Sequence, residues 1–109
     1  MTKETEQAFA ILYCEYKRRR SFGTPKQVAV FFEANHLSKI DAFSSWVPAD
    51  INYAIQELKS AGYVKVDVLG DVALKESGIE CMESKPKEYF DIVSKFFDLA
   101  SILAPLFGL

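Results

Sequence analysis

Polar side chains recur at helical spacing between Pro48 and Ala61, and their types suit the recognition of hydrogen-bonding edges. Asparagine and glutamine each carry a carboxamide that can bond an adenine edge through two atoms, and a tyrosine hydroxyl can contact a phosphate. The same arrangement is expected on the solvated or protein-binding side of any amphipathic helix. Both interpretations stay open for the residues concerned, which are Asn52, Tyr53, Gln56, Lys59 and Ser60.

A second group of candidates is an unbroken run of four basic residues. Lysine and arginine side chains neutralise phosphates, so the run is a candidate for contact with a nucleic-acid backbone. The alternative is a solvated run of cations that interacts favourably with the C-terminal end of a helix. The residues of this basic run are Lys17, Arg18, Arg19 and Arg20.

Charge is distributed unevenly along the chain. Residues 1–20 contain five Lys or Arg and three Glu, whereas residues 48–84 contain three Lys and seven Asp or Glu. An acidic segment is unfavourable for close contact with phosphates. The charge of residues 48–84 therefore favours a protein partner over nucleic acid for that part of the chain.

Other chemistry is disfavoured by the residue types. His36 is the single histidine, so a Ser-His-Asp triad or a His-rich metal site would depend on it. The five glycines are scattered and form no phosphate-binding loop. We expect no enzymatic activity, no cofactor and no bound metal. Cys14 and Cys81 lie in apolar stretches, as buried cysteines do, and with no signal-peptide pattern they favour a cytoplasmic location.

The length and the apolar pattern predict one folded domain that begins with two helices. A chain of 109 residues with 50% hydrophobic residues supports a single core. The first helix is predicted over residues 4–19, with Ile11 and Cys14 opposite its main apolar face, so it should lie between two packing partners. A second helix is predicted from a Thr24 cap to about Asn35, since Pro25 and Gln27 complete its start. Its buried stripe would be Val28, Phe31 and Phe32.

Residues 48–82 predict a third helix, a hairpin and a further helix. Pro48 opens the third helix, and Gly62 is placed to end it in a left-handed conformation. Alternating valines from Val64 then predict a strand that turns at Gly70-Asp71 and returns through residues 72–74. Helix is expected to resume near Lys75 and to continue through Cys81 and Met82.

This organisation resembles the winged-helix regulators of the broad PadR and MarR kind. The resemblance rests on residues 54–64 (AIQELKSAGYV), on the hairpin, and on Lys75-Glu76-Ser77-Gly78-Ile79, which is similar to a T-x-x-G-hydrophobic helix start. It covers about residues 4–83 and implies DNA binding, with the third helix in the major groove and the hairpin as a wing. This chain departs from the family in having Lys75 in place of the threonine. Its wing carries two acids, Asp67 and Asp71, and no arginine.

A last helix is predicted to start at residues 84–88 and to end at Pro105, with an apolar arc covering about half its circumference. Asp91, Lys95 and Asp98 interrupt it, which argues against a membrane span. Its surplus apolar surface favours a symmetric dimer, and the alternative is complete burial within one monomer. The candidate dimer contacts are Phe90, Val93, Phe96, Phe97 and Ala100.

Together these features predict an α+β fold, a winged helix-turn-helix domain at residues 1–83 followed by a C-terminal apolar helix at residues 84–109. The leading functional hypothesis is a small DNA-binding, transcription-regulator-like homodimer on double-stranded DNA, with no membrane contact. The alternative is a winged-helix module that binds a protein partner and no DNA.

Overall fold

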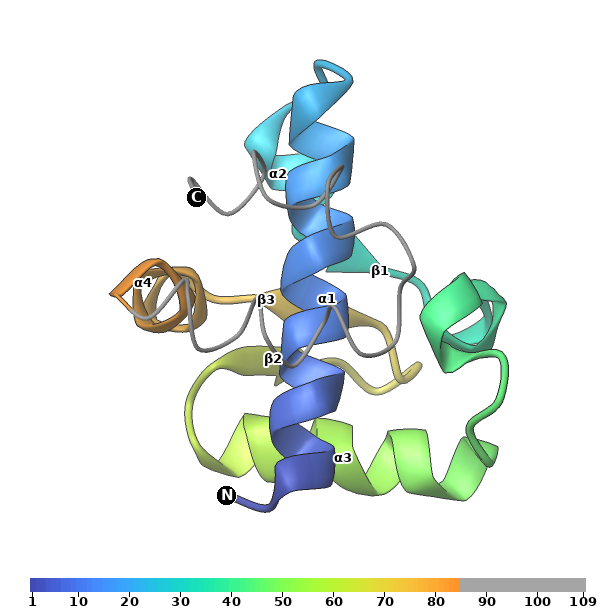
Figure 1. Ribbon diagram of the computed structural model, residues 1–109. Helices are drawn as coiled ribbons and strands as arrows, with labels where there is room; N and C mark the ends of the chain where they lie inside the picture. The colour runs from blue at the N-terminus through green and yellow to red at the C-terminus, as the bar shows by residue number, and fades with distance from the viewer. Residues whose placement is uncertain (85–109) are drawn as a thin grey trace.

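The structure is a computed structural model that describes residues 1–84, and over that range it is a mixed α+β fold (Figure 1). The predicted α+β class is confirmed. Residues 85–109 are not described, so the predicted C-terminal helix and its candidate dimer contacts lie outside the described residues. The elements are α1 (Lys3–Ser21), α2 (Lys26–Ala29), β1 (Phe31–Phe32), the 3-10 helices η1 (Ala34–Lys39) and η2 (Asp41–Phe43), α3 (Pro48–Ser60), β2 (Val64–Val66), β3 (Val72–Leu74) and α4 (Glu76–Ser84).

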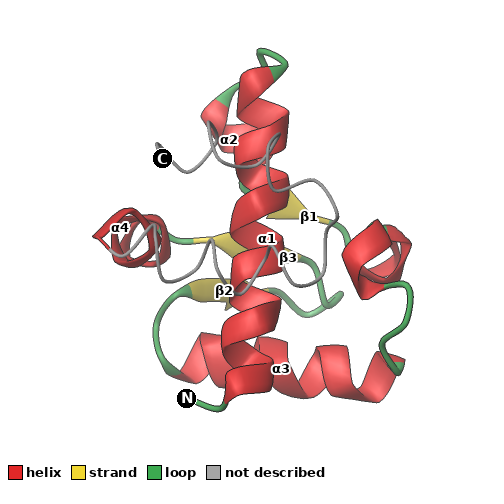
Figure 2. Ribbon diagram, in the orientation of Figure 1, coloured by secondary structure: helices red, strands yellow, loops and turns green. Residues whose placement is uncertain are grey.

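The three strands form one small antiparallel sheet in the order β1-β3-β2. Phe31 pairs with Ala73 across one edge of β3, and Val64 pairs with Leu74 across the other. The sheet lies behind α1, which runs upright through the molecule, while α3 crosses near the N-terminal end of α1 (Figure 2). Side chains from both layers bury each other, because the sheet and α1 each have an apolar face to remove from water.

Helix α1 is the central element of the core. Thr2 caps it, with its hydroxyl accepting a bond from the Thr5 N–H at 3.2 Å. Ile11 is 1% exposed and Cys14 is 5% exposed, although both point away from the main apolar face. The prediction that α1 is buried on two sides is therefore confirmed.

The predicted second helix is wrong in length and in its buried stripe. Helix α2 has only four residues, its cap is Pro25 without a side-chain bond, and Val28 is 59% exposed. Phe31 and Phe32 belong to strand β1 instead, where Phe31 is 40% exposed and Phe32, at 1% exposed, is the one member of the predicted stripe that is buried. The physical reason is tertiary: strand β3 supplies the backbone partners of β1, and the Leu74 N–H donates to the Val30 carbonyl at 3.0 Å. Short apolar runs fit helix and strand equally well until such a partner is known.

The third helix and the hairpin follow the prediction closely. Pro48 begins α3, and Gly62 ends its turn with a φ of +84°. The first hairpin strand is shorter than predicted, since β2 stops at Val66 and Val68 is fully exposed in the turn.

Helix α4 packs closely against the junction between α3 and β2. The Ser77 hydroxyl donates to the Gly62 carbonyl at 2.6 Å, and the Lys75 N–H donates to the Tyr63 carbonyl at 3.0 Å. A Cβ atom on Gly78 would lie 2.5 Å from that same Tyr63 oxygen. Glycine is required at position 78 because the backbone of residue 63 occupies the space.

No helix within residues 1–84 combines the length and the apolar character needed to cross a membrane.

Candidate functional site

The candidate residues of α3 all lie on its exposed side. Four residues of the opposite side, Ile51, Ala54, Ile55 and Leu58, are buried and hold the helix against the core. Tyr53 has 68% of its surface exposed. The predicted polar face is therefore confirmed as a face that a partner can reach, and it consists of Asn52, Tyr53, Gln56, Lys59 and Ser60.

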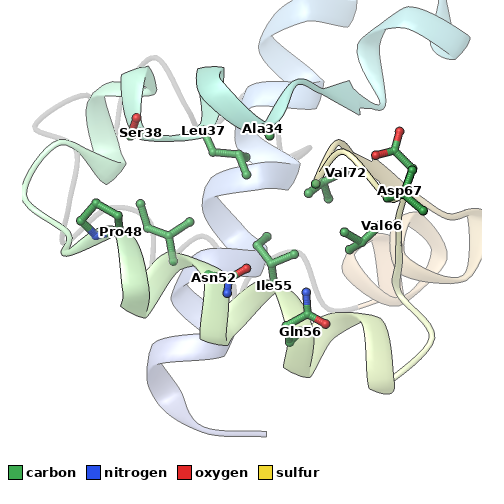
Figure 3. A pocket seen from close by; sticks show the side chains of 13 residues that line it. Ala34, Leu37, Ser38, Pro48, Asn52, Ile55, Gln56, Val66, Asp67 and Val72 are labelled. Carbon is green, nitrogen blue, oxygen red and sulfur yellow. The ribbon is translucent and has the colours of Figure 1, made fainter.

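Asn52 and Gln56 border a groove between α3, η1 and the β2–β3 hairpin (Figure 3), which we call the α3–hairpin groove. Its volume is about 330 Å³. Asp67 is the one ionisable residue among those that line it, and Ser38 is a further polar one. The apolar lining includes Leu37 of η1, Ile51 and Ile55 of α3, and Val66, Val68 and Val72 of the hairpin.

The two acids of the hairpin build its turn. The Asp67 carboxylate oxygen Oδ1 accepts bonds from the Leu69 N–H at 2.8 Å and from the Asp71 N–H at 3.0 Å. Gly70 completes the turn with a φ of +87°, which favours glycine. The Asp71 carboxylate accepts the Ala34 N–H at 2.9 Å and so ties the hairpin to η1. These carboxylates therefore serve as backbone acceptors that fix the shape of the groove.

The turn holds two apolar side chains in water beside the groove. Val68 is 101% exposed and Leu69 is 77% exposed. The backbone bonds of Asp67 fix this turn, so the exposure belongs to an ordered structure. Val68 and Leu69 were not among the residues predicted to form a site. In the sequence they stand out as an apolar pair between Asp67 and Gly70-Asp71, in a turn where polar residues are usual.

The basic run is engaged in contacts within the chain. Arg18 forms a two-pronged bond to the Glu15 carboxylate at 2.9 and 2.7 Å. Arg19 donates to the Phe31 carbonyl at 2.6 Å and its guanidinium lies 4.5 Å from the centre of the Phe32 ring. The first of these contacts pairs Arg18 with a carboxylate of its own helix, to which Arg19 also donates at 3.2 Å, and the second joins α1 to strand β1.

The remaining members of the run also have partners. Arg20 donates to the Thr24 carbonyl at 3.1 Å, beyond the end of α1. The Lys17 ammonium lies 5.7 Å from the centre of the Tyr13 ring. The run therefore stabilises the C-terminal end of α1 and its surroundings through several weak and moderate contacts.

The structure does not bring the basic run and the α3 candidates together. The Thr2 N–H at the start of α1 donates to Glu57 of α3 at 3.1 Å, so α3 lies at the N-terminal end of α1. The basic run lies at the other end, near α2 (Figure 1). A helix of 19 residues is about 28 Å long. The two predicted parts of a DNA-binding surface thus lie at opposite ends of α1.

Ionisation within α1 follows from burial and pairing. Burial raises the pKa of the Cys14 thiol to about 12, with a smaller contribution from Glu15, so this thiol stays protonated at neutral pH. Burial also raises the pKa of Glu15, but bonds to Arg18 and the charges of Arg18 and Arg19 outweigh it and leave that pKa lowered. Cys14 therefore lacks the thiolate character of a reactive cysteine.

Within residues 1–84, no group of three or more His, Cys, Asp or Glu side chains is placed to hold a metal ion. His36 is exposed, with its Nε2 atom 3.5 Å from the Glu33 carboxylate. The two free cysteines, Cys14 and Cys81, lie in the described part of the chain without a disulfide.

No protein-family model, curated protein or solved structure matches this chain. The α3–hairpin groove and the distribution of charge around it are therefore the features that bear on function.

Proposed function

We propose that residues 1–84 form a winged-helix domain that binds another protein through the α3–hairpin groove. The winged-helix assignment is supported by the order of elements, a helix, an edge strand, short helical turns, α3 and a hairpin. It is further supported by the pairing of the edge strand β1 with the second hairpin strand β3. In this assignment α3 takes the position of the recognition helix and the hairpin is the wing.

The observation that carries the protein-binding function is the apolar character of the groove and of its rim. Ile55 and Val72 contribute to its lining, and Val68 and Leu69 stand exposed beside it. Burial of apolar surface stabilises an association by about 25 cal/mol per Å². A partner that covers the groove would remove Val68 and Leu69 from water and would rest on Ile55 and Val72, which the core already buries, whereas a phosphate backbone would gain nothing from them.

The distribution of charge supports the same function. Duplex binding depends chiefly on cations that neutralise phosphates. The basic run lies at the opposite end of α1 from α3, and Arg18 and Arg19 already contact Glu15. The ionisable residue of the groove itself is an acid, Asp67. These features favour a protein surface as the ligand.

Affinity capture followed by titration tests this function. The wild-type chain and a Gln56→Arg variant, which places a long cation at the groove, would be used to isolate binding proteins from an extract. A protein retained by the wild type and lost with the variant would then be purified and titrated against both. A Phe22→Ser variant is the matched control, because Phe22 is 76% exposed at the far end of α1. Equal binding by all three chains would contradict the proposal.

Duplex DNA is a second candidate ligand, favoured by one observation. Tyr53, Lys59 and Ser60 are exposed on the outer side of α3, where a recognition helix would meet base edges. A homodimer formed through residues 84–109 would present two such helices. Gel-shift titration over a range of salt concentrations tests this, since a Lys59 phosphate contact predicts that Lys59→Ala lowers the salt slope by about 1. Absence of a shift with any duplex at low salt would exclude it.

A further inference from the structure

The α3–hairpin groove carries two carboxamides on the same side of α3, one helical turn apart. This inference depends on the proposed protein-binding function and narrows it to one class of partner. We propose that the groove binds an extended segment of a partner protein. The segment has apolar side chains at alternate positions and a Lys or Arg side chain at the hairpin end.

The spacing of Asn52 and Gln56 matches the backbone repeat of an extended chain. Four residues of an α-helix advance about 6 Å along its axis. Two residues of an extended segment advance about 6.6 Å, which returns the same backbone N–H and C=O to the same side. A carboxamide offers one acceptor oxygen and a donor NH₂, so each can pair with one such N–H and C=O. Asn52 and Gln56 can therefore bond the segment at every second residue.

A helical partner would leave these carboxamides without backbone groups to bond. The N–H and C=O groups of a helix are already paired within it, apart from those at its ends. The groove is open to water, so its volume of about 330 Å³ does not separate a helix from an extended segment, and the two carboxamides make that distinction.

The lining of the groove sets the pattern of the segment. Alternate side chains of an extended chain point to the same side, so every second residue would enter the groove. Those residues would rest on the edges of Ile51, Ile55, Leu37 and Val72, each at most 8% exposed, and would pack beside the more accessible Val66 and Val68 of the hairpin. They must therefore be apolar, while the residues between them face water.

Charge complementarity places a cation at one end of the segment. Asp67 is the ionisable residue among those lining the groove, and its Oδ1 atom already accepts two backbone bonds in the turn. These bonds hold the carboxylate in place, and its negative charge stays uncompensated by any lining cation. A Lys or Arg side chain at the hairpin end of the segment would pair with it.

A random peptide library tests the proposal. Twelve-residue peptides displayed on phage would be selected on the immobilised full-length chain and counter-selected on an Asn52→Ala, Gln56→Ala double variant. We expect enrichment of sequences with apolar residues at every second position and a Lys or Arg to one side. A synthetic peptide of this kind should lose at least tenfold in affinity with the double variant. It should lose severalfold with Asp67→Asn, which keeps an Oδ1 acceptor for the turn and removes the charge.

N-methylation of the peptide backbone distinguishes recognition of an extended chain from simple apolar burial. Methyl groups on the amides that face Asn52 and Gln56 should abolish binding. Methyl groups on the intervening amides should change the affinity by no more than about twofold, which is small when a tenfold change corresponds to about 1.4 kcal/mol. Tyr53→Ser is the matched protein control, because Tyr53 is exposed on α3 and does not line the groove.

The outcomes separate this proposal from the function on which it depends. Selection could instead enrich peptides with apolar residues three and four apart, the spacing of a helix, whose binding depends on the groove but not on N-methylation. That result would reject the extended segment and would still support binding of a protein in the groove. Absence of any peptide sensitive to the double variant would also overturn the extended segment. The protein-binding function itself fails only if the captured partner also binds the Gln56→Arg variant normally.

Discussion

The β2–β3 hairpin and the C-terminal end of α1 each carry a cluster of like charges, acidic in the hairpin and basic at the end of α1. At the hairpin, carboxylates of Asp67 and Asp71 accept backbone N–H groups. At the C-terminal end, guanidinium groups of Arg19 and Arg20 donate to backbone carbonyls. Each cluster satisfies main-chain groups that would otherwise be unpaired.

The difference lies in what the bonds leave exposed. The carboxylates of the hairpin shape a turn that presents Val68 and Leu69 to water beside a groove. The arginines instead fasten α1 to strand β1 and to the residues after α1. A cluster of charged residues in a sequence therefore does not by itself locate a binding surface. Its side chains can already be hydrogen-bonded to main-chain N–H or C=O groups of the same chain.

Replacement of Arg19 should give the largest loss of stability at the basic end. Arg19→Met keeps much of the apolar stem and removes the bonds to Phe31 and Glu15, so we expect about 2–3 kcal/mol of destabilisation, typical of lost charge-assisted bonds. Urea unfolding measures it. Arg20→Met, which loses one exposed bond to the Thr24 carbonyl, is the control and should cost less. An equal decrease in the free energy of unfolding for the two variants would contradict the structural role assigned to Arg19.

Replacement of Asp71 tests whether the acid of the hairpin acts as an acceptor or as a charge. Asp71→Ala leaves the Ala34 N–H without its bond at 2.9 Å and should cost about 1–2 kcal/mol in urea unfolding. Asp71→Asn retains an oxygen acceptor and should cost less than about half as much. If the two variants were equally destabilised, the negative charge itself would be the stabilising feature.

Acid should weaken the basic end through Glu15. Its pKa in the folded state lies below the ordinary value of 4.5 because its bonds to Arg18 and the charges of Arg18 and Arg19 outweigh burial. The unfolded chain therefore takes up the proton first, so the contribution of Glu15 is full above about pH 4.5 and is lost as the pH falls below it. Unfolding measured at pH 7 and pH 3 should show a larger difference for the wild type than for Glu15→Gln. An equal difference would argue against the pairing.

The smallest effect is expected for nucleic-acid binding by the basic run. An Arg18→Ala, Arg20→Ala double variant should change the affinity for any duplex that binds by less than about twofold, because these residues lie remote from α3. Gel-shift titration at low salt measures it, with Lys59→Ala as the comparison on α3. A large loss of duplex affinity in the double variant would show that the basic run contacts the nucleic acid, and it would favour DNA as the ligand.

Much of the fold follows from local signals in the sequence. Pro48 and Gly62 bound α3 because proline suits the first turn of a helix and glycine suits a positive φ. The hairpin follows from alternating valines and a glycine turn. Strand β1 could not be predicted in this way, since Phe31 pairs with Ala73, more than 40 positions later. Without that partner, Phe31 and Phe32 extend an apolar helical pattern.

The candidate site was predictable only in part. The exposure of Asn52 and Gln56 follows from helical periodicity. The groove beside them needs Leu37, Val66 and Val72 from two other elements, whose approach is not encoded in local spacing. Gly78 is a comparable case: the resemblance pointed to a glycine there, and the Tyr63 carbonyl explains why a side chain is excluded.

The sequence by itself determined which residues face water and which face the core along α3 and the strands β2 and β3, because these depend on periods of 3.6 and 2 residues. Tertiary structure alone decided the use of the charges. Arg19 meets Phe31, and Asp71 meets Ala34, only when distant segments are folded together. Electrostatic and hydrogen-bond partners depend on distances through space, and the chain specifies those only after it has packed.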